Sequence, residues 1–468
     1  MPKKFINELF ENLEVVDITA RGKGVVKSKE GKVIFVSGVI PGDKISVETF
    51  KKRRGYFEGK LIKINKFSKD RIEPECEHFG ICGGCKWQNM DYEAQLLFKQ
   101  KEILHNLKNL SGMILPEIEN IQSAPESYFY RNKMEYSFSN QRWLTAEEIA
   151  DKSMNIEKKG LGFHKAGMWD KVVDIHQCHL QSEPSNKIRN TIKAFALEKG
   201  LEFFNPKERV GFLRSLIIRN SNRGEFMVLI QFSKENKSQR EALMNFLKDQ
   251  FEIASLMYCI NSKANDSLYD QEVICYDGKS YITEEMEGLH FKINAKSFFQ
   301  TNTKQAYELY KITRDFAGLQ GYEIVYDLYT GTGTIAQFVA KDCSKVVGVE
   351  SVPEAIKAAQ YNAKENEIEN AFFEVGDMRK VFNQDFINRH GEADVVITDP
   401  PRNGMHPAVV KQLLFLKPKK IVYVSCNNAT QARDLYQMKD QYKLSRSKAV
   451  DMFPQTQHVE NIVLLEKI

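Results

Sequence analysis

From about Glu323 onward, short apolar runs alternate with segments of helical composition. The apolar runs read EIVYDLY, KVVGVE, AFFEVGD, DVVITDPP and IVYVSCN, and helical stretches such as PEAIKAAQYNAKEN separate them. Strands that alternate with helices through short links build a largely parallel sheet with helices on both faces. Two more strand-like runs, Lys443–Met452 and Val459–Glu466, close the chain. The sequence therefore predicts an α/β fold, with a doubly wound Rossmann-like domain over residues 301–468.

Two further domains are expected before this one. Residues 1–71 contain 17 Lys and Arg against 9 Asp and Glu, a net charge of +8, whereas the whole chain carries +5. Short β-branched runs at Lys32–Ser37 and Lys44–Phe50, separated by glycine-containing turns, predict a small OB-like β-barrel over residues 1–71. Residues 72–300 mix β-rich and helical runs and predict a central α+β domain.

The basic stretch Lys51–Arg54 of the first domain lies beside two aromatic residues, Tyr56 and Phe57. Basic and aromatic side chains together on a small barrel suit the phosphates and bases of a nucleic acid. We therefore expect this domain to bind RNA.

Composition narrows the class of protein. Hydrophobic residues make up 42% and charged residues 28%, which are values of a folded globular chain. No apolar run approaches the roughly 20 residues that span a bilayer, and acids interrupt the apolar stretch near the N-terminus, so we expect neither a membrane span nor a signal peptide. Eight cysteines in 468 residues are too sparse for a disulfide scaffold. They are expected to serve as thiols, metal ligands or a nucleophile in the reducing cytoplasm.

The segment Asp327–Thr334 joins the first strand of the Rossmann-like domain to its first helix. Gly331 and Gly333 at such a turn let a ligand approach the backbone closely. No lysine follows the second glycine as in a Walker motif, which excludes a P-loop. The turn is therefore a candidate cofactor site.

Acidic residues follow three of the predicted strands. Glu350, 17 residues beyond Gly333, ends the second strand and is placed to accept hydrogen bonds from ribose hydroxyls. Asp377 ends the third strand and Asp399 the fourth. Ligands of open α/β sheets bind at this edge, and the closing strand pair favours a nucleoside-bound methyl donor, S-adenosylmethionine, over NAD.

Cys426 follows the strand IVYVSCN at the same edge, among polar neighbours. A thiolate that adds to C6 of uracil or cytosine makes an enolate whose C5 can attack a methyl group. A base must then remove the C5 proton so that the thiolate can leave. Glu460, at the start of the last strand-like run, is the best candidate, because desolvation there would raise its pKa.

Three cysteines, Cys76, Cys82 and Cys85, lie in the glycine-rich loop CEHFGICGGC, and Cys178 could supply a fourth thiolate. Four thiolates suit either Zn²⁺ or an iron–sulfur cluster, and the spacing does not decide between them. The spacing differs from that of radical methylthiolating enzymes.

Two long motifs resemble the signatures of the RNA uracil-5-methyltransferase family. They are DPPRNG with IVYVSCNNAT in residues 399–430, and VDMFPQTQHVE in residues 450–460. The similarity extends to SFFQTN at residues 297–302 and YRNK at residues 130–133, and the N-terminal barrel resembles a TRAM module. The resemblance implies that Cys426 is the nucleophile and Glu460 the base. It implies contacts with S-adenosylmethionine from six residues: Gln300, Tyr329, Thr334, Glu350, Asp377 and Asp399.

The resemblance also bears on the metal and the substrate. Members that methylate 23S ribosomal RNA are similar to this chain in carrying such cysteines with a [4Fe–4S] cluster, whereas members that act on tRNA generally lack the cluster and the barrel. It therefore implies a cytoplasmic, monomeric 23S rRNA (uracil-C5)-methyltransferase with a [4Fe–4S] cluster, zinc being the alternative metal.

Other readings of the sequence are the same chemistry on tRNA and a non-catalytic RNA-binding factor for ribosome assembly. Intact Cys426, Glu460 and strand-end acids argue against the non-catalytic reading. Methylation of an amino group is disfavoured because Arg402 stands where such enzymes have an aromatic residue after Asp-Pro-Pro.

Overall fold

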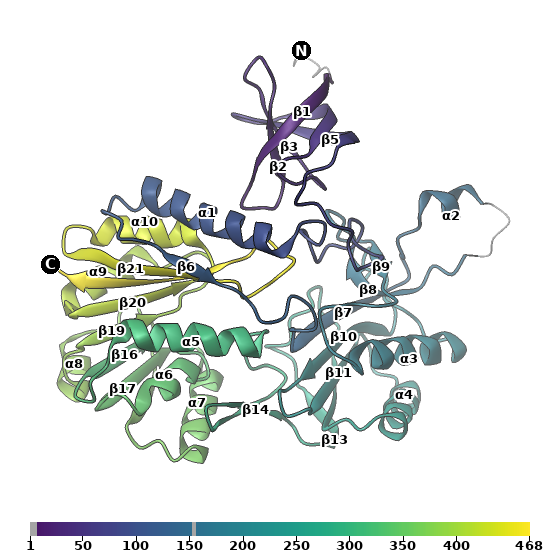
Figure 1. The fold of residues 1–468 in the computed structure, drawn as a ribbon. Coiled ribbons are helices and arrows are strands. Elements are labelled where there is room, and N and C mark those ends of the chain that lie inside the picture. Colours follow the sequence, from purple (N-terminus) through teal and green to yellow (C-terminus); the bar gives the residue numbers. More distant parts are fainter. Residues whose placement is uncertain (1–6, 152–155) are drawn as a thin grey trace, which may run out of the picture. The chain divides into compact units, whose positions relative to one another are not determined.

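The computed structural model describes residues 7–151 and 156–468, which form two compact units. Unit 1 contains the residues up to Glu102 together with Phe453–His458, and unit 2 contains Ile103–Met452 together with Val459–Ile468. Figure 1 shows the elements of each unit. Among the helices of the described ranges, none is both long and apolar enough to cross a bilayer.

A closed five-stranded β-barrel dominates unit 1. Its strands follow the order β1-β2-β3-β5-β4, and pairing of β1 with β4 closes the barrel. The strands are β1 (Leu9–Ile18), β2 (Gly24–Lys27), β3 (Val33–Val36), β4 (Lys44–Lys52) and β5 (Phe57–Lys66). Alternate residues point inward, as the period of a strand requires. They form a fully buried core of Val26, Ile34, Val36, Ile45 and Val47. The barrel predicted at the N-terminus is confirmed.

Helix α1 (Tyr92–Leu110) begins in unit 1, and its residues from Ile103 onward belong to unit 2. The segment Phe453–His458 is internal to the C-terminal part of the chain, yet it folds with unit 1. Unit 1 is therefore built from two stretches that lie far apart in the sequence.

Unit 2 contains a mixed seven-stranded sheet of order β13-β12-β11-β10-β7-β8-β9. Only β11 and β12 pair in parallel within it. The strands are β7 (Lys133–Ser139), β8 (Gly160–His164), β9 (Val172–Asp174), β10 (Leu213–Asn220), β11 (Phe226–Phe232), β12 (Ser255–Ile260) and β13 (Ile274–Gly278). Its helices are α2 (Ala146–Ala150), α3 (Ser185–Glu198) and α4 (Lys237–Gln250), and a hairpin of β14 (Ile282–Met286) and β15 (Leu289–Ile293) follows.

The second sheet of unit 2 has eight strands in the order β18-β17-β16-β19-β20-β22-β21-β6. Its strands from β18 to β20 pair in parallel, and β22 pairs antiparallel with both β20 and β21. The strands are β6 (Glu119–Gln122), β16 (Ile324–Leu328), β17 (Lys345–Glu350), β18 (Ala371–Val375), β19 (Val395–Thr398), β20 (Lys420–Ser425), β21 (Tyr442–Val450) and β22 (Glu460–Lys467).

Helices cover this sheet in two groups (Figure 1). Helices α5 and α6 pack together, and α9, α10 and the C-terminal part of α1 share one apolar core with the sheet. The helices are α5 (Thr303–Ala317), α6 (Thr334–Ala340), α7 (Pro353–Glu365), α8 (Gln384–His390), α9 (Pro407–Leu416) and α10 (Asn428–Met438). The predicted α/β fold is confirmed, while the domain boundaries at residues 71 and 300 stay predictions.

Candidate active site

The turn between β16 and α6 has room for a ligand against its backbone. Tyr329, Gly331 and Gly333 lie in the left-handed region, with φ of 62°, 56° and 76°. A Cβ atom at Gly331 would meet no heavy atom within 4 Å, whereas one at Gly333 would lie 2.7 Å from the Phe373 ring. Gly333 is therefore needed for packing, and Gly331 leaves the backbone approachable. The turn fits a cofactor such as S-adenosylmethionine.

Asp327 is buried in β16, and its side chain forms hydrogen bonds with the turn and with the helix that follows it. Its Oδ2 atom accepts hydrogen bonds from the Thr330 hydroxyl at 2.5 Å and from the Ala336 N–H at 3.1 Å. Its Oδ1 atom has no hydrogen-bond partner in the part of the chain that the structure describes. Burial raises the pKa of Asp327 to about 7. An acid inside an apolar strand was a visible signal, but Asp327 was not among the predicted contacts.

The three strand-end acids lie at the same edge of the sheet, because β17, β18 and β19 belong to its parallel part. The Oε1 atom of Glu350 accepts from the N–H and the hydroxyl of Ser351, at 2.7 and 2.9 Å. Asp377 forms an ion pair with Arg379 at 2.6 Å, and this guanidinium lowers the pKa of Asp377 to about 2. Burial raises the pKa of Asp399 to about 7. The positions are as predicted, and contacts of these acids with a cofactor stay predictions.

The other three residues predicted to contact the cofactor, Tyr329, Thr334 and Gln300, lie in two segments of the chain. Burial and the charges of Asp434, Glu350 and Asp377 raise the pKa of Tyr329 to about 12, so Tyr329 lies near the strand-end acids. Thr334 is buried at the first position of α6. Gln300 belongs instead to the segment between β15 and α5, where its carbonyl accepts a hydrogen bond from Asn132 Nδ2 at 2.9 Å.

Strands β20 and β22 bring Cys426 and Glu460 together. Their antiparallel register ends with Ser425 opposite Asn461, and Cys426 directly follows Ser425 while Glu460 directly precedes Asn461. Cys426 is half-buried and Glu460 is only 5% exposed. The structure therefore brings the predicted nucleophile and the predicted base close enough for the charge of Glu460 to act on the thiol.

The electrostatics of this pair follow mainly from burial. Burial raises the pKa of the Cys426 thiol to about 11, the charges of Glu460 and Asp399 act in the same direction, and Arg402 opposes them. Burial raises the pKa of Glu460 to about 8, with a further increase from Asp399 and a decrease from Arg402. At neutral pH the site favours the thiol and the carboxylic acid, and Arg402 is a cation that favours their ionised forms.

Three acids lie close to Tyr310, a buried residue of α5. Burial and the charges of three carboxylates raise the pKa of Tyr310; the carboxylates are Asp399, Asp327 and Glu460. Acids from three strands therefore lie around one phenol. Tyr310 was not predicted as part of the site, because an apolar face of an amphipathic helix gives no signal that it faces acids.

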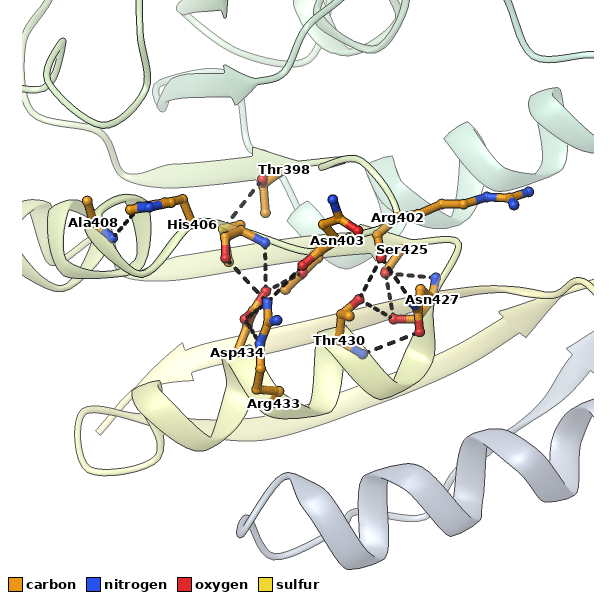
Figure 2. Close-up of polar contacts among 12 residues, drawn as sticks. Thr398, Arg402, Asn403, His406, Ala408, Ser425, Asn427, Thr430, Arg433 and Asp434 are labelled. Atoms are coloured by element: carbon orange, nitrogen blue, oxygen red, sulfur yellow. Dashed lines mark hydrogen bonds and ion pairs between the residues drawn. The ribbon is translucent and has the colours of Figure 1, made fainter. Parts of the chain in front are cut away.

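The loop that carries Arg402 is fastened to the start of α10, as Figure 2 shows. Asn427, directly after Cys426, donates its Nδ2 hydrogen to the Arg402 carbonyl at 2.9 Å. Asp434, which is fully buried, accepts a hydrogen bond from the Met405 N–H at 2.8 Å. The loop after β19 and the turn that carries the thiol are thus held as one piece.

Three of the predicted metal ligands, Cys76, Cys82 and Cys85, are half-buried in one loop of unit 1. The Gly84 N–H donates to the Sγ atom of Cys82 at 3.4 Å, and amide groups make such contacts with cluster thiolates. Cys178 is buried and belongs to unit 2. The donor set in the loop fits a thiolate-bound cluster, and the four-ligand set stays a prediction.

The basic stretch Lys51–Arg54 comprises the last two residues of β4 and the first two of the turn to β5, and all four residues are exposed. Arg53 forms an ion pair with Glu58 at 2.7 Å. The Tyr56 ring stacks on Phe35 with centroids 4.4 Å apart. The tip presents several positive charges to solvent, and its contact with RNA stays a prediction.

Known RNA methyltransferase sequences are similar to this chain. Residues 220–468 match the family described as tRNA (uracil-5-)-methyltransferase. An uncharacterized RNA methyltransferase of Bacteroides thetaiotaomicron is 49% identical over 96% of this chain and 100% of its own length. An uncharacterized RNA methyltransferase of Chlorobaculum tepidum is 38% identical over 97% of this chain and 96% of its own length.

A solved structure is similar over nearly the whole chain. It is the Pyrococcus abyssi tRNA (uracil-54, C5)-methyltransferase in complex with S-adenosyl-L-homocysteine, with a TM-score of 0.76 and 31% identity. The similarity covers 97% of this chain and 99% of the other, so it includes most of the barrel as well as the two sheets.

Proposed function

The chain belongs to the tRNA (uracil-5-)-methyltransferase family, and on this premise we propose that it methylates C5 of uridine in RNA with S-adenosylmethionine. We propose a covalent route, in which the sulfur of Cys426 bonds transiently to C6 of the base. The single observation that supports this route best is the pairing of β20 with β22, at the end of which Cys426 and Glu460 adjoin the paired residues Ser425 and Asn461.

The residues of the site suit the steps of this route. The half-buried Cys426 loses its thiol proton to solvent as the sulfur bonds to C6, and the electron pair of the C5–C6 bond moves to form an enolate. S-adenosylmethionine, when bound, supplies the methyl group that C5 attacks. Glu460 in its carboxylate form then takes the C5 proton, the C5–C6 double bond re-forms and the Cys426 thiolate leaves. A pKa of about 8 is suited to a base that works near neutral pH.

The cofactor would bind at the edge formed by the turn after β16 and the strand-end acids. We propose that Gln300, Tyr329, Thr334, Glu350, Asp377 and Asp399 hold it. The approachable backbone at Gly331 and the unpaired Oδ1 atom of buried Asp327 support this assignment. The bidentate pairing of Asp377 with Arg379 must rearrange if Asp377 contacts the ligand directly.

We propose 23S ribosomal RNA as the substrate, with the target uridine turned out of its stack to reach Cys426. The exposed basic tip Lys51–Arg54 and the cysteine loop support ribosomal RNA through the family resemblance. Transfer RNA is the second candidate, because the Pyrococcus abyssi enzyme that is similar over nearly the whole chain acts on tRNA. A barrel alone therefore does not distinguish the two substrates.

We further propose that Cys76, Cys82, Cys85 and Cys178 bind a [4Fe–4S] cluster, with zinc as the alternative. The methyl transfer moves no electron between redox centres, so the cluster would serve the fold.

The test is a map of 5-methyluridine in 23S rRNA and tRNA from cells with the gene, without it, and with Cys426→Ala. We expect one or more 23S sites to lose the modification in both altered strains. Loss only in tRNA would select the second candidate. Loss without the gene but not with Cys426→Ala would overturn the covalent route, and an unchanged map would favour a non-catalytic RNA-binding factor.

A further inference from the structure

A carboxylate is buried beside the segment that carries Gln300. Glu284 of β14 is 1% exposed, although the adjacent Glu285 is exposed. Its Oε1 atom accepts hydrogen bonds from the Thr303 hydroxyl at 3.0 Å and from Asn132 Nδ2 at 3.4 Å. Its Oε2 atom accepts from the Asn222 N–H at 3.2 Å. Both oxygens of a buried acid are thus engaged, by groups from three other segments of unit 2.

Asn132 links Glu284 and Thr303 to the backbone of Gln300 by hydrogen bonds. Its Nδ2 atom lies 2.9 Å from the Gln300 carbonyl and 2.9 Å from the Thr303 hydroxyl, and its backbone N–H donates to the Thr301 carbonyl at 2.9 Å. The Asn132 carbonyl in turn accepts from the Asn220 N–H at the end of β10. The backbone around Gln300 is therefore tied to the seven-stranded sheet through one asparagine.

The two ends of the Gln300 segment have separate attachments. Arg219, 5% exposed, donates through Nη2 to the Ser297 carbonyl at 2.8 Å. Asn302 donates through Nδ2 to the Met452 carbonyl at 3.0 Å, at the end of β21. The segment is therefore attached to both sheets of unit 2, and Thr303, which bonds to Glu284, directly follows the second attachment.

Burial and the neighbouring hydrogen-bond donors shift the pKa of Glu284 in opposite directions. Burial raises its pKa to about 7, while the hydrogen bonds from Asn222 and Thr303 and the charge of Arg219 lower it. A purely structural role would be served as well by an apolar residue of this volume, because a buried acid is costly to ionise. An acid with three donors instead fixes the direction of each donor.

We propose that Glu284 is a positioning residue, which through Thr303 and Asn132 holds the Gln300 segment in the geometry that binds S-adenosylmethionine. This inference rests on the proposed function, because it takes Gln300 as a cofactor contact. Glu284 itself touches neither the cofactor nor the base. Its loss weakens cofactor binding rather than the chemical step.

The experiment measures binding of S-adenosylhomocysteine to the full chain by calorimetry, and then KM for S-adenosylmethionine and kcat. The variants are Glu284→Ala and Thr303→Val. Thr303→Ser keeps the hydroxyl, and Glu285→Ala removes the neighbouring exposed acid from the same strand. Gln300→Ala reports on the segment itself, and melting temperatures report on the fold.

We expect Glu284→Ala and Thr303→Val to raise Kd and KM about tenfold, as the loss of a hydrogen bond to a charged group does, with a much smaller change in kcat. Thr303→Ser and Glu285→Ala should bind like the wild type. If Glu284→Ala does not fold, the comparison of Thr303→Val with Thr303→Ser still tests whether the hydrogen bond to Glu284 supports cofactor binding.

Wild-type affinity in Thr303→Val, or equal losses in Thr303→Val and Thr303→Ser, would overturn the positioning role. Wild-type affinity in Gln300→Ala would overturn it as well, because the segment would then carry no cofactor contact. A wild-type protein that binds no S-adenosylhomocysteine would contradict the proposed function itself. Weaker binding in Gln300→Ala with normal binding in Glu284→Ala and Thr303→Val would contradict only the inference about Glu284.

Discussion

The thiol and the acid that we propose as nucleophile and base are both groups whose burial favours the neutral form. The pKa of Cys426 is about 11 and that of Glu460 about 8, and the carboxylate of Asp399 raises both. Arg402 lowers both, and its backbone carbonyl accepts a hydrogen bond from Asn427, the residue after Cys426. Burial therefore favours the protonated thiol of Cys426, and a protonated thiol is less open to side reactions than a thiolate.

Replacing Glu460 with Gln keeps the size of the side chain and removes the base. We expect turnover to fall by about 10²–10⁴, the range for loss of a general base, while the bond between Cys426 and the RNA still forms. A covalent protein–RNA species should therefore accumulate on denaturing gels. Glu466→Gln, on the same strand, is the matched control and should give no such species. Efficient turnover by Glu460→Gln would remove Glu460 from the mechanism.

The same substitution should change stability in a pH-dependent way. The pKa of Glu460 is about 8 in the folded protein against an ordinary 4.5, so the unfolded chain ionises first. The free energy of unfolding should therefore fall as the pH rises from about 4.5 to 8, and no further above that. We expect Glu460→Gln to be more stable than the wild type by roughly 1–3 kcal/mol at pH 8.5 and by less at pH 5.5. Thermal unfolding at both pH values checks this, and an equal difference at the two would contradict it.

Sequence reasoning reached some of these residues and not others. Cys426 could be predicted from the sequence because a strand end followed by polar residues is a local feature. Glu460 became a candidate from the chemistry and the resemblance, since its proximity to Cys426 depends on the pairing of β20 with β22. Tyr310 and Glu284 were missed because the burial of a polar group depends on packing between distant segments, whereas Asp327 had a local signal, an acid within an apolar strand, that was not used.

At the scale of secondary structure, the parallel strands were predictable because they are buried on both faces. Such strands read as continuous apolar runs, and residues 395–398 (VVIT) are fully buried. Strand β6 (Glu119–Gln122) was not predicted, because the run ENIQ is mostly polar and pairs with β21 at the edge of the sheet. The inclusion of Phe453–His458 in unit 1 was equally invisible, since no local pattern reports it.

The hairpin tip between β4 and β5 is the element that we expect to contact the RNA backbone. Changing Lys51, Lys52 and Arg54 together to Ala removes three exposed charges. RNA affinity should fall, and the slope of log K against log salt should decrease in magnitude by about 2–3. Salt titrations of RNA binding check this.

The control for the hairpin variant removes three exposed lysines of unit 2, Lys357, Lys364 and Lys411, and so makes the same change in net charge. This control should keep the wild-type slope. Equal slopes in the hairpin variant and the wild type would mean that the RNA follows another surface.

At the scale of the whole molecule, the chain combines a barrel, a cysteine loop and two sheets, and each was anticipated from a different kind of signal. The barrel came from charge and turn spacing, the parallel sheet from apolar periodicity, and the cysteine loop from ligand spacing. The mixed seven-stranded sheet was expected only as an α+β region, because antiparallel order depends on which distant strands pair. Its junction with the other sheet, where Asn132 and Glu284 lie, had no signal in the sequence.

The proposed metal site takes its four cysteines from two stretches that lie far apart in the sequence. We expect protein purified without oxygen to be brown and to contain about four iron atoms per chain, the content of one [4Fe–4S] cluster. Cys82→Ser and Cys178→Ser should each lower the iron content, while Cys259→Ser should not. Metal analysis that finds zinc in place of iron would select the alternative, and no metal in fresh anaerobic protein would refute the site.

The central claim is a bond between the sulfur of Cys426 and C6 of a uridine. The most direct measurement uses RNA that carries 5-fluorouridine at the modified position, because fluorine at C5 cannot be removed as a proton and the adduct cannot resolve. After incubation with S-adenosylmethionine, the account predicts a stable protein–RNA species whose cross-linked peptide contains Cys426, and no such species with Cys426→Ala. An adduct on another residue, or methylation of normal RNA by Cys426→Ala, would contradict it.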